Sequence, residues 1–220
     1  MFTAAGRRIG PLVVNRIRLV FAVIFLSTFH WATLGTLIPF DAAPERWLWL
    51  GLSGIVGLVI GDIFLFQAFV LIGPRLTMLM MSLAPIIAAL QAWIFLDETL
   101  TSGQIFGILL TLAGIGWVVM EGSGQNRNDR DYGRGILLGL GGAIGQATGL
   151  VLAKNGLGGE FSPISANLIR MLTATILLWT LTFFQGQAKE TLQALRVNKK
   201  GALFTTAGAF LGPFVGVSLS

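Results

Sequence analysis

Long apolar runs recur along this chain from one end to the other. A helix needs about 20 apolar residues to cross a hydrocarbon core about 30 Å thick. Runs near that length occupy residues 19–39, 47–72, 76–96, 104–120, 136–153, 164–184 and 202–220. Only 11% of the residues are charged, against about 25% in an ordinary soluble domain. The sequence therefore predicts an all-α, polytopic membrane helix bundle with seven spans and short connections.

Composition excludes several kinds of site. The chain has no cysteine, which excludes disulfides and thiolate metal sites, and its one histidine, His30, cannot build a metal site alone. No G-x-x-x-x-G-K-[ST] phosphate loop is present, so ATP is not expected to drive the protein. We expect no cofactor and no metal.

Basic residues divide unequally between the two sides that alternating spans would create. The net charge of +5 could suggest nucleic acid, but the cations lie in loops, so we expect no nucleic-acid partner. One side carries two, Arg46 and Lys154, and Arg170 lies inside a span. The other side carries twelve, which the positive-inside rule places in the cytoplasm: Arg7, Arg8, Arg16, Arg18, Arg75, Arg127, Arg130, Arg134, Lys189, Arg196, Lys199 and Lys200.

The most polar interval, residues 121–135, predicts a linker between residues 1–120 and 136–220. The two parts resemble each other. GPLVVNRIRLVFAVIFLST, which starts at Gly10, aligns with SPISANLIRMLTATILLWT, which starts at Ser162, at an offset of 152 positions. The alignment pairs residues that are rare in apolar helices, which indicates an internal repeat: Pro11 with Pro163, Asn15 with Asn167 and Arg18 with Arg170.

The repeat also predicts that the chain is part of a longer protein. The span at 136–153 has no counterpart before Gly10, and the second copy stops within the run at 202–220. Restoring the missing helix gives five spans per unit and about ten in all. Tandem units with an odd number of spans face opposite ways in the membrane, which is the inverted-repeat design of secondary transporters.

A set of residues late in the first unit has the order typical of one transporter family. Pro85 lies inside a span, Glu98 closes it, and Gly107 and Gly114 lie in the next. With the duplicated Pro-xxx-Asn-xx-Arg helix start, the chain resembles the EamA-type transporters of the drug/metabolite transporter superfamily.

The resemblance implies a multi-pass protein of the cell membrane, expected to be the bacterial inner membrane. It implies transport of small metabolites or amino-acid-like solutes by alternating access, and no enzymatic activity. Solute and lipid are then the partners, with a homo-oligomer or separately supplied helices as a further possibility. The family usually keeps both termini cytoplasmic, which conflicts with the charge count, and we favour the charge count.

Polar side chains inside the spans are the candidates for the solute pathway, because ionisable groups in lipid usually face a cavity or a partner. Asp62 is the one carboxylate well inside a span. Arg18 and Arg170 either snorkel to headgroups or flank a central cavity and hold an anionic group. The expected pathway residues are Arg18, His30, Asp62, Gln67, Gln91, Gln146, Asn167 and Arg170.

Two other functions remain as alternatives. GLSG at residues 51–54 fits a Gly-x-Ser-Gly protease pattern, in which His30 would activate Ser53, although the short pattern is weak in a glycine-rich chain. A truncated chain could also be an inactive remnant or an assembly factor.

Glycine spacing and one acidic pair predict structure rather than chemistry. Gly57/Gly61, Gly103/Gly107, Gly135/Gly139 and Gly141/Gly145/Gly149 predict small faces where helices pack closely. Asp97 and Glu98 mark the end of a span, and Thr101 to Gln104 fits a capping box for the next.

Overall fold

The structure, a computed structural model, describes residues 10–122, 129–159, 161–189, 191 and 193. The helical segments among these residues are α2 (Pro11–Leu34), α3 (Pro44–Gly54), the π-helical η1 (Ile55–Gly61), α4 (Asp62–Leu71), α5 (Gly73–Met81), α6 (Ala84–Phe95), α7 (Ser102–Gly122), α8 (Asp129–Leu157) and α9 (Pro163–Phe184). The described part of the chain contains no strand. The predicted all-α class is therefore confirmed.

Six helices in the described ranges are long and apolar enough to cross a membrane. Five are single helices or continuous helical runs: α2, α3–η1–α4, α7, α8 and α9. The sixth is the pair α5–α6, which is interrupted at Ser82 and Leu83. The seventh predicted span, at 202–220, lies outside the described residues.

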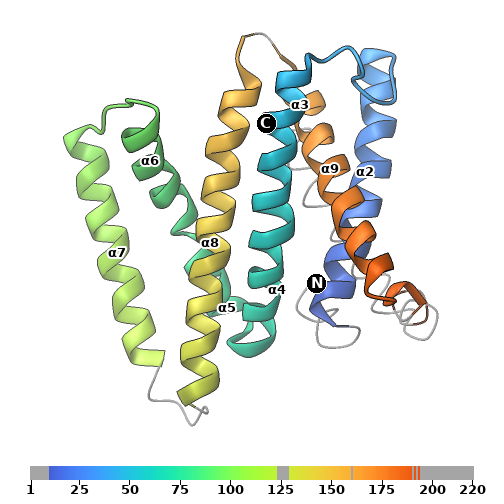
Figure 1. Ribbon diagram of the computed structural model, residues 1–220. Helices are drawn as coiled ribbons and strands as arrows, with labels where there is room; N and C mark the ends of the chain where they lie inside the picture. Colours follow the sequence, from blue (N-terminus) through green and yellow to red (C-terminus); the bar gives the residue numbers. More distant parts are fainter. Residues whose placement is uncertain (1–9, 123–128, 160, 190, 192, 194–220) are drawn as a thin grey trace.

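The spans stand side by side and alternate in direction, with their connections gathered at two ends (Figure 1). α8 is the central helix, packing against α3, η1 and α4 on one side and against α5 and α6 on the other. α2 and α9 pack together next to α3–η1–α4 and run in opposite directions. α7 lies at the edge, and only 6% of its most apolar window is buried.

Helix ends follow the local sequence. Proline occupies the first turn of α2, α3, α5, α6 and α9, where its missing N–H costs no hydrogen bond. Asp97, with φ 51°, follows the end of α6. The capping box is confirmed, because Thr101 N donates to Gln104 Oε1 over 2.8 Å and Gln104 N donates to Thr101 Oγ1 over 3.4 Å.

The polar interval predicted as a linker at 121–135 is partly helical. α7 continues to Gly122, and α8 begins at Asp129, so α8 starts ahead of its apolar run. Charged residues such as Arg130 and Arg134 form its first turns. A helix that extends beyond the hydrocarbon core exposes polar residues to water, which an apolar window does not detect.

Backbone contacts between glycines form the centre of the bundle. A Cβ added to Gly145 would lie 2.7 Å from Gly61 Cα, and one added to Gly149 would lie 2.9 Å from Gly57 Cα. Such contact between η1 and α8 is possible only with glycine on both helices. The predicted close packing is confirmed here but not on α7, where a Cβ at Gly103 or Gly107 would meet nothing within 4 Å.

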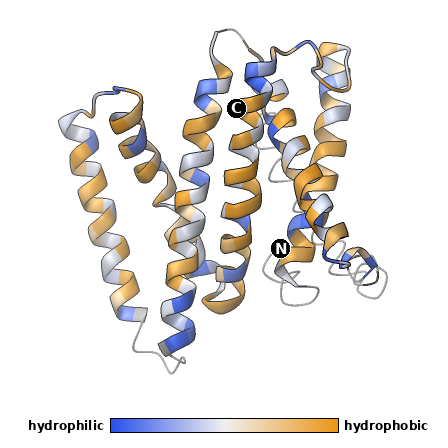
Figure 2. Cartoon of the chain, in the orientation of Figure 1, coloured by the Kyte–Doolittle hydropathy of each residue, from blue (hydrophilic) through white to orange (hydrophobic). Residues whose placement is uncertain are grey.

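The helices consist mostly of hydrophobic residues along their lengths, and hydrophilic residues gather near their ends and connections (Figure 2). Large exposed side chains include Trp31, Trp93, Phe106 and Trp117. Large apolar side chains exposed along several helices fit a protein whose sides face lipid.

Candidate functional site

The central span α3–η1–α4 changes helix type halfway along its length. Ile55–Gly61 forms seven residues of π-helix, with α-helix on both sides. Segments of this kind are rare and often occur at functional sites. Asp62 comes directly after η1 and is 1% exposed, so its carboxylate is held inside the bundle.

Arg18 forms an ion pair with this carboxylate. Its Nη2 contacts Asp62 Oδ2, although the two residues belong to different spans, α2 and α4. The same Nη2 donates to Asn15 Oδ1 over 3.2 Å, and the guanidinium lies 5.6 Å from the centre of the Phe66 ring. Arg18 therefore points into the bundle rather than toward the headgroups.

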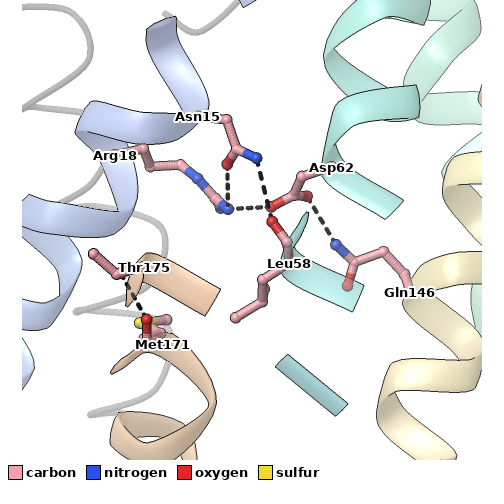
Figure 3. A network of polar contacts seen from close by, with 7 residues as sticks. All are labelled: Asn15, Arg18, Leu58, Asp62, Gln146, Met171 and Thr175. Carbon is pink, nitrogen blue, oxygen red and sulfur yellow. Dashed lines mark hydrogen bonds and ion pairs between the residues drawn. The ribbon is translucent and has the colours of Figure 1, made fainter. Parts of the chain in front are cut away.

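Two amides complete the cluster (Figure 3). Gln146 of α8 donates from Nε2 to Asp62 Oδ1 over 2.9 Å, so both carboxylate oxygens are engaged. Asn15 donates from Nδ2 to the carbonyl oxygen of Leu58, within η1, over 3.2 Å. The cluster thus joins α2, the central span and α8 through charge and hydrogen bonds.

Arg170 of α9 reaches the same region from another side. A Cβ added to Gly57 would lie 3.7 Å from Arg170 Nη2 and 3.8 Å from Gln146 Oε1, so both polar groups face this glycine. Arg170 Nε is enclosed without a hydrogen-bond partner.

The backbone of α9 fixes where Arg170 stands. A Cβ added to Gly54 would clash with the Arg170 carbonyl oxygen, so a side chain at Gly54 would displace α9. Thr173 Oγ1 donates to that same oxygen over 3.0 Å. The arginine is therefore positioned by backbone contact with the central span.

The other predicted pathway residues lie apart from this cluster. His30 Nδ1 donates to the Thr36 carbonyl oxygen over 2.5 Å, and its Nε2 accepts from Ser165 Oγ over 2.9 Å. Gln91 Nε2 donates to Thr148 Oγ1 over 2.9 Å. Gln67 and Asn167 are half-buried, and no hydrogen bond joins either side chain to another described residue.

The arrangement does not support the protease alternative. Ser53 Oγ donates to the Gly149 carbonyl oxygen over 2.5 Å, whereas His30 is engaged by Ser165 and Thr36. Ser53 and His30 therefore form no nucleophile–base pair in this structure.

Chemically, the cluster can hold charge and exchange hydrogen bonds. It contains a single carboxylate, two guanidinium groups and two amides, and the described residues contain no group of three metal-ligating side chains. Intramembrane polar groups of this kind mark solute or ion pathways.

Comparison with protein-family models identifies the family of the chain. The sequence model of the EamA-like transporter family matches residues 1–120 and 133–220. The chain belongs to the EamA-like transporter family. Among curated proteins, none matches its sequence. Family membership and the six apolar helices together identify a multi-pass membrane protein of a transporter family within the drug/metabolite transporter superfamily.

The residues that suggested the EamA-like family are structural and lie away from the cluster. Pro85 lies in the first turn of α6, and Glu98, after α6, forms an ion pair with Lys154 of α8. Both partners are exposed, at 45% and 58%. A Cβ at Gly107 or Gly114 on α7 would meet no described atom within 4 Å.

Sequence reasoning missed three contributors to the cluster of this EamA-like protein: Asn15, the Leu58 carbonyl and Phe66. A signal existed for Asn15, which precedes Arg18 by three positions and therefore shares its helical face. No signal existed for the Leu58 carbonyl, because a change of helix type leaves no pattern in an apolar run.

Proposed function

We propose that this protein carries small organic solutes, metabolites or amino-acid-like compounds, across a membrane by alternating access and without ATP. The single observation that carries the proposal is the buried Arg18–Asp62 ion pair, held by Gln146 within the membrane-spanning part of the bundle. An ion pair in lipid is costly to bury, and transporters retain such groups where solutes or ions pass.

The directions of α2 and α9 support an inverted repeat. Each begins at the proline of the duplicated motif, and each carries its arginine seven positions later, at Arg18 and Arg170. The helices run in opposite directions, so the two copies of the motif begin at opposite ends of the bundle (Figure 1). In secondary transporters with inverted repeats, the substrate site lies where the repeats meet.

Contacts at the two ends of α2 and α9 could open in turn. At one end, Arg16 donates from Nη1 to Thr191 Oγ1 over 2.9 Å and from Nη2 to Gln187 Oε1 over 2.7 Å. At the other end, His30 binds Ser165. Alternating access requires the contacts at one end to break while the contacts at the other end hold. The glycine faces of η1 and α8 place no side chain in their contact, so these two helices can slide past each other.

Solute flux through proteoliposomes tests this function. The purified chain is reconstituted and loaded with labelled amino acids and organic acids, and wild type is compared with Asp62→Asn and Arg18→Gln. Arg46→Gln, which removes a charge at a helix end, is the matched control. We expect wild type and the control to carry at least one solute, and the cluster variants to lose about tenfold or more of that flux. Equal flux in all four proteins would contradict the proposed pathway.

The basic residues support an orientation with the α7–α8 connection in the cytoplasm of a bacterial inner membrane. Arg75, Arg130 and Arg134 belong to the helix starts at one end of the bundle, whereas Arg46 and Lys154 belong to the other end. Labelling Asn128→Cys from each side of the membrane tests this orientation. Labelling by an impermeant reagent from outside the cell would reverse it.

A further inference from the structure

A groove lies between α6 and α8, on the side of α8 that faces away from α4. Its volume is about 240 Å³. The apolar part of its lining consists of Ala88, Ala89 and Ala92 of α6 and of Leu150 and Val151 of α8. Three of these five residues are alanines, so small side chains leave the space open. Glu98 and Lys154 complete the lining.

The two charged residues lie at one end of this groove. Lys154 belongs to the last turn of α8 and Glu98 follows α6, and both helices end at the same end of the bundle (Figure 1). The two side chains form an exposed ion pair, which adds little to stability. An ammonium has three donors and a carboxylate about four acceptor positions, so each partner keeps sites for a further charged group.

Trp93 indicates the depth of the charged end in the membrane. It is 53% exposed and lies two positions before the end of α6 at Phe95. Exposed tryptophans gather at the level of the lipid headgroups. Ala88 lies about 7.5 Å deeper, because it precedes Trp93 by five positions and a helix rises 1.5 Å per residue. The groove therefore has its charges among the headgroups and its apolar wall within the hydrocarbon.

We infer that this groove binds a phospholipid with an ethanolamine headgroup. The lipid phosphate contacts Lys154, the lipid ammonium contacts Glu98, and the first part of one acyl chain lies against the three alanines. The site is separate from the Arg18–Asp62 cluster, so the inference goes beyond the proposed transport function and does not depend on it.

The charges of this headgroup complement those of the ion pair. Phosphatidylethanolamine carries a phosphate and an ammonium joined by two carbons, so one molecule presents both charges to neighbouring side chains. Its ammonium donates N–H bonds to a carboxylate, whereas the trimethylated nitrogen of phosphatidylcholine has no N–H to donate. Phosphatidylglycerol has no cation for Glu98, and its negative charge would lie beside that carboxylate. Ethanolamine thus satisfies Glu98 and Lys154 together.

Thermal unfolding of the purified full chain in detergent, with one phospholipid added at a time, tests the inference. The probes are phosphatidylethanolamine, phosphatidylcholine and phosphatidylglycerol with identical acyl chains, so that only the headgroup differs. The readout is the midpoint of unfolding as a function of the mole fraction of lipid in the micelles. We expect phosphatidylethanolamine to raise the midpoint at a mole fraction about tenfold below the other two, the effect of one charge-assisted hydrogen bond.

Four variants locate the binding site. Lys154→Gln should weaken the binding of all three lipids about tenfold, because each has a phosphate. Glu98→Gln should remove the preference for phosphatidylethanolamine over phosphatidylcholine. Ala89→Leu fills part of the groove without changing a charge, and should weaken all three lipids while it keeps their order. Arg75→Gln, an exposed residue at the start of α5, is the charge-matched control and should behave as wild type.

Several outcomes would overturn the inference. Equal effects of the three lipids would show unspecific solvation of the helices, and phosphatidylglycerol that binds as well as phosphatidylethanolamine would assign the site to Lys154 alone. Lys154→Gln or Ala89→Leu that binds as wild type would place the lipid elsewhere. The comparison of headgroups uses wild type alone, so it decides the question even if a variant fails to fold.

Discussion

The starts of α2 and α9 carry the same motif but have different environments. In α2, the arginine and the asparagine are bound to the central span, through Asp62 and through the Leu58 carbonyl. In α9, the arginine touches the central span through its backbone, at Gly54, while its guanidinium has no ion-pair partner among the described residues. Two copies of one motif thus differ in their contacts, because α2 binds the central span through side chains and α9 contacts it through its backbone.

Among the substitutions that distinguish the two helix starts, removing the charge of Asp62 should lower the free energy of unfolding the most. Asp62→Asn keeps a partner for Gln146 but leaves Arg18 as an unpaired buried charge, which costs about 3–5 kcal/mol. We expect a correspondingly lower free energy of unfolding, measured by detergent-induced unfolding of the purified protein.

A second substitution checks that the unpaired charge is the cause. Adding Arg18→Gln to Asp62→Asn removes the unpaired cation, so the double variant should be more stable than Asp62→Asn alone. If the double variant lost as much stability as the two single variants together, Arg18 and Asp62 would act independently.

Disturbing the backbone contact of α9 should have the next largest effect. Gly54→Ala places a methyl group against the Arg170 carbonyl oxygen, and overpacking of this kind costs about 1–3 kcal/mol. Gly107→Ala on α7 is the matched control, because its Cβ would meet no described atom within 4 Å. Thermal unfolding should separate the two variants, and equal midpoints would argue against close contact between α3 and α9.

The two asparagines give a direct comparison of the copies. Asn15→Ala leaves the Leu58 carbonyl and one Arg18 N–H without their partner, which costs about 1–3 kcal/mol. Asn167→Ala breaks no hydrogen bond among the described residues, so its unfolding free energy should stay within about 0.5 kcal/mol of wild type. A similar loss in both variants would show that the two copies have equivalent partners.

Much of the fold was predictable from the sequence, because it follows from local composition. Apolar run length predicted the six described spans, and glycine spacing predicted the contact of Gly57 and Gly61 with α8. The start of α8 was missed because its first turns are polar. The π-helical turn was missed because Ile55–Gly61 remains apolar and contains no residue that enforces one helix type over the other.

The membership of the cluster was only partly predictable. Rarity inside apolar runs singled out Arg18, Asp62, Gln146 and Arg170, since lipid makes every such residue costly. It could not tell which of them meet, because Arg18 and Asp62 come together only through the packing of two spans. The same criterion selected His30 and Gln91, which make their hydrogen bonds elsewhere.

The most direct test measures unfolding and solute flux together for Arg18→Gln and Arg170→Gln, with Arg46→Gln as control. We predict that both cluster variants lose flux, but that only Arg18→Gln is destabilised, because it alone leaves Asp62 without its ion-pair partner. Loss of flux with preserved stability in Arg170→Gln would indicate that Arg170 belongs to the transport pathway rather than to the support of the fold. Equal destabilisation of both variants, or full flux in either, would contradict the account.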